Sequence, residues 1–239
     1  MSLKNLTSDE SIADEKDSVG GGGVLNSGLY ESKITMAYVT TSSGGATGLV
    51  IQAKTSEGRD IRSTQWMTSG TAKGGKNFYE KDGVKNYLPG FLLAQSLALL
   101  TCGKEISEME TETKVVNVYD YTAKKEVPTK VDMVMDLLGK DVLIGLIKQV
   151  VDKNVKNAAG AYVPSGDTRE ENEIDKFFRA SDRKTTAEIR AKAETAAFAD
   201  TWVEKHFDKT RNRATKVAGT AGAPRAAAAT NKPAASLFA

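Results

Sequence analysis

Three segments in the first third of the chain alternate apolar and polar residues, a pattern typical of strands with one buried face. The alternation predicts strands over residues 28–41, 47–55 and 59–68. Small polar residues and glycine separate these segments at 42–45 and 57–58, as expected of turns. The residues predicted to share a face are Tyr30, Ile34, Met36 and Tyr38 in the first strand, and Leu49, Ile51 and Ala53 in the second.

A helix is predicted to begin at Pro89, which suits a first helical turn, and to stop at Gly103. Further strands are predicted over residues 113–121, 127–137 and 142–151, the last following a tight turn at 138–141. Three strands, a helix and more strands is the element order of an OB-fold, a Greek-key barrel. We therefore expect a mainly β protein with accessory helices, built on an OB-fold of five to six strands.

Composition divides the chain into four parts. Residues 1–23 are acidic and glycine-rich and should form a disordered leader, and residues 24–180 should form the folded domain. Capping-box spacings at Thr168 with Glu171 and at Thr185 with Glu188 predict two helix starts. The second start predicts a C-terminal amphipathic helix over 181–208 with a side that can dock, and residues 209–239 should form a disordered basic tail.

Bulk properties narrow the class of protein. The 239 residues are 40% hydrophobic, which is enough for a core, and the formal net charge is only +2. Cys102 is the single cysteine, so neither a disulfide framework nor a cysteine zinc site fits. The longest apolar stretch, residues 91–100, is too short to cross a bilayer, and the acidic start does not resemble a signal peptide. We expect a soluble intracellular protein without membrane contact.

The segment between the third strand and the helix carries the strongest functional signal. Residues 69–87, termed here the connector, interleave lysines with aromatic rings among glycines. Lysines suit the phosphates of a nucleic-acid strand and exposed rings suit unstacked bases, so a flexible connector of this composition favours single-stranded DNA binding. The alternative is a solvated, disordered hairpin insertion. A P-loop spacing at Gly70 and Gly75-Lys76 is rejected because Asn77 stands where magnesium needs Ser or Thr.

Neighbouring strands extend this surface. Alternation places Arg62, Thr64 and Trp66 on one face of the third strand, opposite Ile61 and Met67, so Trp66 is either a stacking platform or a core residue. The tyrosines at 119 and 121 have the same two interpretations, as stacking platforms or as residues at the edge of the core. The predicted DNA-binding residues are Arg62, Trp66, Lys73, Lys76, Phe78, Tyr79, Lys81, Lys85, Tyr87, Tyr119, Tyr121, Lys124, Lys125 and Lys148.

Enzymatic chemistry is not indicated. The acidic residues at 108, 110 and 112 and at 132, 136 and 141 show no spacing that brings carboxylates to one pocket, as a two-metal nuclease needs. The single histidine, His206, has no nucleophile near it in sequence. We expect a protein that is not an enzyme and that uses no cofactor and no metal.

Four segments, residues 69–76, 87–91, 135–140 and 168–178, resemble the OB-fold single-stranded DNA-binding proteins of tailed bacteriophages, particularly podoviruses. The resemblance covers residues 24–179. It implies sequence-independent coating of exposed DNA during phage DNA replication, recombination or repair, without a cofactor, in the cytoplasm of an infected bacterium.

The end of the chain departs from this family. Such proteins often end in an acidic tail with a hydrophobic tip that recruits replication proteins, whereas here no acidic residue follows Asp208 and the last residues are Ser236-Leu237-Phe238-Ala239. We expect the basic tail to add salt-dependent DNA affinity, and the C-terminal region to contact replication or transcription proteins. Two alternatives remain open: a DNA-bound adaptor of RNA polymerase, and a virion or assembly protein that makes protein contacts only.

Overall fold

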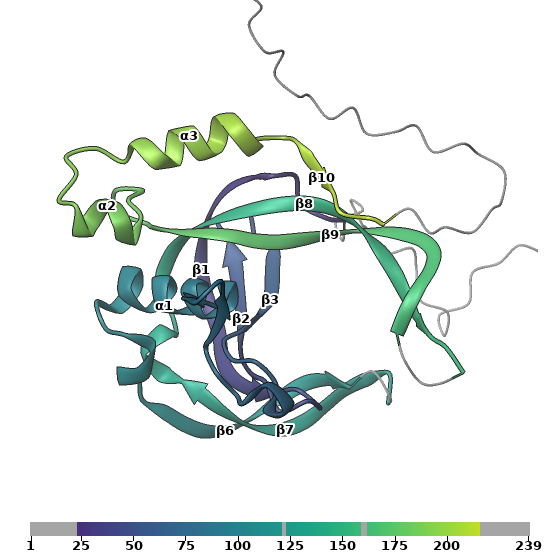
Figure 1. Ribbon diagram of the computed structural model, residues 1–239. Coiled ribbons are helices and arrows are strands. Elements are labelled where there is room, and N and C mark those ends of the chain that lie inside the picture. Colours follow the sequence, from purple (N-terminus) through teal and green to yellow (C-terminus); the bar gives the residue numbers. More distant parts are fainter. Residues whose placement is uncertain (1–22, 121–122, 159–161, 216–239) are drawn as a thin grey trace, which may run out of the picture. The chain divides into compact units, whose positions relative to one another are not determined.

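The computed structural model describes residues 23–120, 123–158 and 162–215 (Figure 1). The strands in these residues are β1 (Gly28–Thr41), β2 (Thr47–Thr55), β3 (Asp60–Trp66), β4 (Phe78–Lys81), β5 (Val84–Tyr87), β6 (Thr111–Asp120), β7 (Lys125–Val134), β8 (Asp141–Lys156), β9 (Tyr162–Arg179) and β10 (Thr210–Asn212). The α-helices are α1 (Pro89–Cys102), α2 (Thr186–Arg190) and α3 (Ala197–His206). The prediction of a mainly β protein is confirmed.

The chain forms two compact units. The first holds the described residues through Gln149 together with Glu170–Arg211, and it contains the core and the connector. The second holds Val150–Arg169 and the described residues from Asn212 onward. Within the second unit, the Arg213 N–H donates to the Val150 carbonyl at 2.8 Å, and the Lys156 ammonium lies 5.4 Å from the centre of the Tyr162 ring.

Most strands belong to one open antiparallel sheet with the order β10-β8-β1-β2-β3. Strand β1 is its centre because its two halves have different partners. The first half pairs with β8, from Gly28 opposite Leu146 onward, and the second half pairs with β7 at Tyr38 opposite Met133. Strand β6 pairs with β7, and β9 pairs with β8. Among the described residues, the strand order ends at β3.

A β-bulge in β1 changes which residues face the core. The register with β2 shifts between Ile34 and Met36. The extra residue inverts the alternation, since one added position moves every later side chain to the other face. Ile34 and Ala37 therefore enter the main core, while Tyr38 packs with Val50 on the opposite face. The predicted single face through Tyr30, Ile34, Met36 and Tyr38 is wrong beyond the bulge.

The main core is formed by side chains of β1, β2, β3, α1, β8 and β9. Leu49, Ile51 and Ala53 of β2 are all buried there, as the alternation predicted. Helix α1 begins at Pro89 and ends at Gly103, whose left-handed φ of +68° lets its N–H donate to the Leu99 carbonyl at 3.1 Å. The predicted helix is confirmed at both ends.

Two helix predictions fail in different ways. The segment expected to begin a helix at Thr168 belongs to β9, because it pairs with β8 and Glu171 accepts a hydrogen bond from the Gln149 amide at 3.0 Å instead of capping. The capping box at Thr185 and Glu188 is present, but it starts only the short helix α2. The chain turns at Lys192, where φ is +51°, so the predicted single helix is two.

Part of the predicted docking side of α3 is buried within the first unit, while Phe198 and Phe207 of that side are exposed. Ala199 and Trp202 are buried against Leu143, Ile147 and Phe178. The Trp202 indole N–H donates to the Asp175 carboxylate at 2.8 Å, so the buried ring has its polar partner.

The structure describes only the start of the predicted basic tail. Residues 1–22 and 216–239, where the leader and most of the basic tail were expected, lie outside the described residues. The start of the expected tail forms β10, where the Arg211 guanidinium donates to Gln149 Oε1 at 2.7 Å and contacts Glu173. Across the described ranges, no helix has the length and apolar character needed to cross a membrane.

The packing of α1 on the end of β3 can be tested at Gly90, which lies in the first turn of the helix. A Cβ at Gly90 would lie 2.2 Å from the Trp66 carbonyl oxygen, a backbone atom that cannot move aside cheaply. We expect Gly90→Ala to lower the free energy of unfolding in urea by about 1–3 kcal/mol through overpacking, although helix propensity alone would favour alanine. Gly44→Ala is the control, since its Cβ would meet only the Ser42 hydroxyl at 3.9 Å. A Gly90→Ala protein as stable as the wild type would contradict this packing.

Candidate nucleic-acid interface

The connector is a folded element, which corrects the prediction of a flexible loop. The N–H and hydroxyl of Thr71 both donate to the Gly44 carbonyl, at 2.9 and 3.0 Å, and so tie the connector to the β1–β2 turn. Ser69 and Lys76 close its first part, since the Ser69 N–H donates to the Lys76 carbonyl at 2.8 Å and the Lys76 N–H to Ser69 Oγ at 3.0 Å. These hydrogen bonds therefore order a glycine-rich segment.

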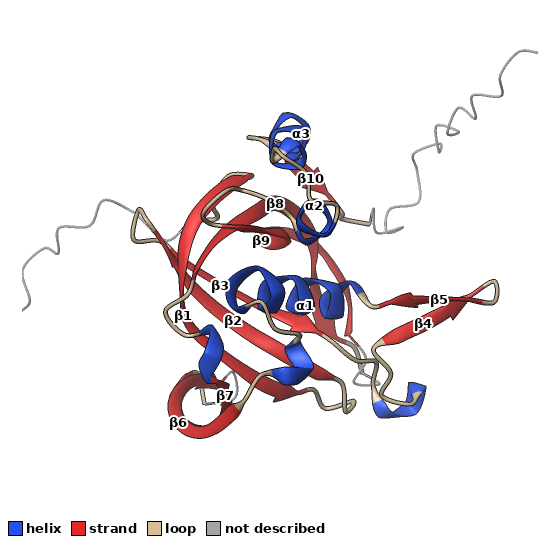
Figure 2. Cartoon of the chain, turned by 90° about the vertical axis from the view of Figure 1, so that its left-hand side faces the viewer, coloured by secondary structure: helices blue, strands red, loops and turns tan. Residues whose placement is uncertain are grey.

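The second part of the connector is the hairpin β4–β5. Phe78 pairs with Tyr87, and the strands are joined at Asp82-Gly83, where both residues have positive φ, as type I′ turns require. The Leu88 N–H donates to the Asn77 carbonyl at 2.8 Å and closes the base of the hairpin. Figure 2 shows the hairpin extending from the sheet beside the start of α1. A P-loop would need a helix after Lys76, and here β4 follows instead.

Trp66 is exposed at the end of β3. Ile61 and Gln65 are buried on one face of this strand, and Arg62 and Trp66 are exposed on the other, as predicted. The Trp66 ring lies over Gly48 of β2, because a Cβ at Gly48 would approach the ring to 2.8 Å. The ring is 43% exposed. This arrangement gives the indole a fixed position and leaves part of its surface to solvent.

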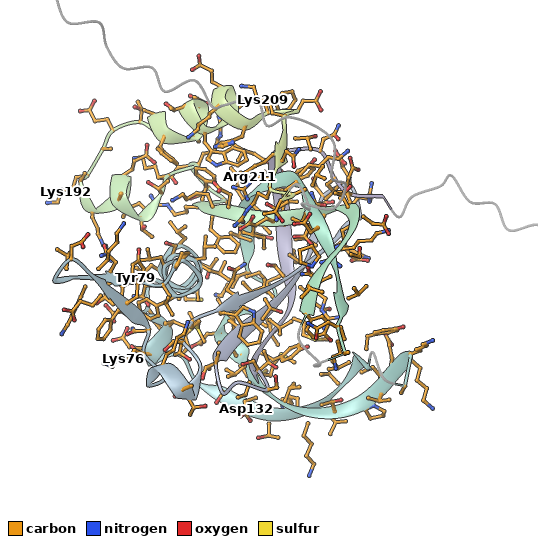
Figure 3. All side chains as sticks on the ribbon, turned by 45° about the vertical axis from the view of Figure 1, so that its right-hand side comes forward. Lys76, Tyr79, Asp132, Lys192, Lys209 and Arg211 are labelled. Carbon is orange, nitrogen blue, oxygen red and sulfur yellow. The ribbon has the colours of Figure 1, made fainter. Side chains whose placement is uncertain are left out.

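A cavity of about 900 Å³ joins Trp66 to the connector. Five predicted DNA-binding residues line it together: Trp66, Lys73, Lys76, Phe78 and Tyr79. Its other walls come from the β1–β2 turn at Gly44, from the first turn of α1 and from two acidic residues, Glu80 and Glu173. Lys76 and Tyr79 lie on the same side of the molecule (Figure 3). Rings and ammonium groups of β3, of the first part of the connector and of β4 thus share one concave surface.

A second cavity of about 340 Å³ lies against the hairpin. Asn77, Phe78, Lys85 and Tyr87 line it, so Phe78 borders both cavities. The Tyr87 ring packs on Phe91 of α1, with ring centres 5.0 Å apart. Predicted residues Lys85 and Tyr87 therefore belong to the hairpin surface next to the larger cavity.

Other predicted residues of β3 and the hairpin lie near the larger cavity without lining it. Arg62 shares the sheet face of Trp66, but its Nη2 donates to the Tyr38 hydroxyl at 3.3 Å and it lines a separate cavity with Glu171. Lys81 is exposed beside the turn at Asp82.

The remaining predicted residues lie elsewhere. Val116 and Val118 of β6 pack toward Tyr38, so Tyr119, the next residue in the alternation, lies on the other face of β6. Lys124 and Lys125 are exposed where β6 turns into β7, and Lys148 pairs with the Glu170 carboxylate at 3.0 Å. Tyr121 lies outside the described residues.

Sequence reasoning missed Glu173 and Arg211. Glu173 lines the larger cavity, and the Arg211 guanidinium from β10 contacts both Glu173 and Asp175. The pair is 38 residues apart in sequence and joins β9 to β10, so no local pattern signals it. The expected helix at Thr168 also hid the fact that Glu173 belongs to a strand.

The acidic residues and the histidine were considered above as candidates for enzymatic chemistry. In the part of the chain that the structure describes, no group of three or more His, Cys, Asp or Glu side chains has metal-binding geometry. The His206 ring packs on Trp202 with ring centres 4.9 Å apart, and its burial lowers the pKa of the imidazole.

Comparison with known proteins found no matching family model, no matching curated protein and no matching solved structure. The functional argument therefore rests on the residues and contacts described above.

The exposure of Trp66 is testable without any ligand. Trp66 is 43% exposed and Trp202 is 3% exposed. We expect Trp66→Phe to remove most of the fluorescence that acrylamide quenches, and Trp202→Phe, the matched control, to retain it. Equal quenching of the two variants would show that the Trp66 ring is covered in solution.

Proposed function

We propose that this chain binds single-stranded DNA without sequence preference, across the cavity that joins Trp66 to the connector. One observation carries the proposal: exposed rings and lysines from β3 and the connector line a single cavity of about 900 Å³. Trp66 and Tyr79 supply the stacking surfaces, and Lys73 and Lys76 supply charge for phosphates.

The chemistry of the cavity favours a single strand over a duplex. Trp66 and Tyr79 are 43% and 47% exposed, so their rings are available to a partner. In a duplex the faces of the bases are covered by neighbouring bases, whereas a single strand offers them for stacking worth about 1–3 kcal/mol per base. Phosphate contacts and stacking carry little sequence information, which supports binding independent of sequence.

We further propose that the sheet is an OB-fold with an insertion. Strands β1, β2, β3, β8 and β9 correspond to the five barrel strands, α1 lies between the third and the fourth, and the β6–β7 hairpin is inserted before β8. OB-folds bind oligonucleotides on the face of their second and third strands and through the loop between the first two. The cavity is lined by Trp66 of β3 and by Gly44 of that loop, which supports this assignment.

The biological role that we propose rests on the proposed binding and on the resemblance of four sequence segments to a phage protein family. A protein of this kind, similar to the phage single-stranded DNA-binding proteins, coats DNA exposed during replication or recombination in the cytoplasm of an infected bacterium. The polymerase-adaptor alternative requires a free apolar side on the C-terminal helix. Ala199 and Trp202 of that side are buried within the first unit, whereas Phe198 and Phe207 are exposed, so the adaptor stays an alternative.

A titration of oligo-dT tests the proposal. We expect oligo-dT to quench Trp66 fluorescence, with weaker binding at higher salt, and an equal-length duplex to bind less well. Trp66→Leu should weaken oligo-dT binding roughly 5- to 150-fold, the loss of one stacked base.

Tyr119→Leu is the matched control for that titration, since Tyr119 is 40% exposed and lies away from the cavity. It should bind oligo-dT like the wild type. Absence of wild-type binding at low salt would refute the proposed function, and equal losses in the two variants would refute its location.

A further inference from the structure

Two lysines of the connector converge on one aromatic ring. The ammonium groups of Lys76 and Lys85 lie 5.6 and 5.1 Å from the centre of the Phe78 ring. Lys76 lines the larger cavity and Lys85 the smaller one, and Phe78 borders both. Both distances lie within the range in which a cation is attracted to the electron-rich face of a ring.

This contact makes Phe78 different from its neighbour Tyr79. Tyr79 is 47% exposed, whereas Phe78 is half-buried and its ring already holds two cations. A base that stacked on Phe78 would compete with these ammonium groups for the ring. A phosphate would not compete for the ring, because it is attracted by the same two charges.

The two ammonium groups have no anionic partner among the residues that the structure describes. Neither Lys76 nor Lys85 forms an ion pair with a carboxylate of the described residues, although Glu80 lies opposite Lys85 in the hairpin register. Long lysine side chains lose conformational freedom when they bind, and the ring reduces that loss by restricting them beforehand. The pair is therefore available to an anion other than the carboxylates of the described residues.

We infer that Lys76 and Lys85 form a binding site for a backbone phosphate of the bound strand, and that Phe78 is the positioning residue that holds both ammonium groups in place. The inference rests on the proposed function and changes the predicted role of Phe78 from a stacking platform to a support for phosphate contacts. Stacking then belongs to Trp66 and Tyr79.

The test compares salt dependence on strands with and without bases. Binding is measured over a series of salt concentrations with oligo-dT and with an abasic strand of equal length, both with hydroxyl ends so that only internal phosphodiesters are present. Each phosphate contact contributes about 0.7 to the slope of log affinity against log salt on single strands. Phe78→Leu should reduce the slope by about 0.7 on both strands, because one phosphate is involved.

Further variants make this test specific. Phe78→Tyr keeps a ring and should keep the wild-type slope. Tyr79 lies next to Phe78 in β4. Tyr79→Leu should weaken oligo-dT binding without changing the salt slope, and it should leave binding of the abasic strand unchanged. In the Lys76→Gln/Lys85→Gln protein, adding Phe78→Leu should change the slope no further. Phe78→Met replaces Phe78→Leu if circular dichroism shows that the leucine variant does not fold.

The outcomes separate the inference from the proposed function. Suppose that the wild type binds oligo-dT and that Phe78→Leu keeps the wild-type salt slope but binds oligo-dT more weakly, with abasic-strand binding unchanged. Phe78 is then a stacking platform and the inference is wrong. A Phe78→Leu variant whose salt slope falls with oligo-dT but not with the abasic strand would also overturn the inference. If the wild type binds neither strand at low salt, the proposed function itself fails.

Discussion

The close approach of Gly90 to Trp66 is the constraint on which the candidate site depends. The first turn of α1 packs so tightly on the end of β3 that a Cβ at Gly90 would meet the Trp66 backbone at 2.2 Å. This contact fixes both ends of the connector next to each other. A segment whose ends are held together must fold back on itself, and the connector does so as the β4–β5 hairpin.

The composition of the site follows from that geometry. Because the connector returns to its starting point, Tyr79 of the hairpin and Trp66 of β3 line the same cavity although they are separated in sequence. Gly44 binds Thr71 and keeps the first part of the connector against the β1–β2 turn. Lysines alone on a mobile loop would supply charge, whereas the folded connector also gives that charge a position relative to the rings.

Local sequence signals predicted the elements that depend on local physics. Strand β2 and helix α1 begin and end where alternation, Pro89 and Gly103 indicated, since these signals act within a few residues. The exposed face of β3 with Trp66 was also predicted. The composition of the connector identified candidate binding residues, and the structure brings Lys73, Lys76, Phe78 and Tyr79 to one cavity.

Features set by contacts between distant residues were not predictable in the same way. The bulge in β1 has no signal in the alternation, and it reverses the faces after Ile34. The capping-box spacing at Thr168 is a short-range signal that pairing between β8 and β9 overrides. The contact of Arg211 with Glu173 depends on β10, which lies where sequence composition indicated disorder.

Hydrogen–deuterium exchange with and without oligo-dT tests the central claim most directly, because it locates the bound strand without changing any side chain. The account predicts slower exchange in residues 44–48 and 62–88 when oligo-dT is bound, with α3 unchanged. Binding that slows exchange only outside these two segments would contradict it.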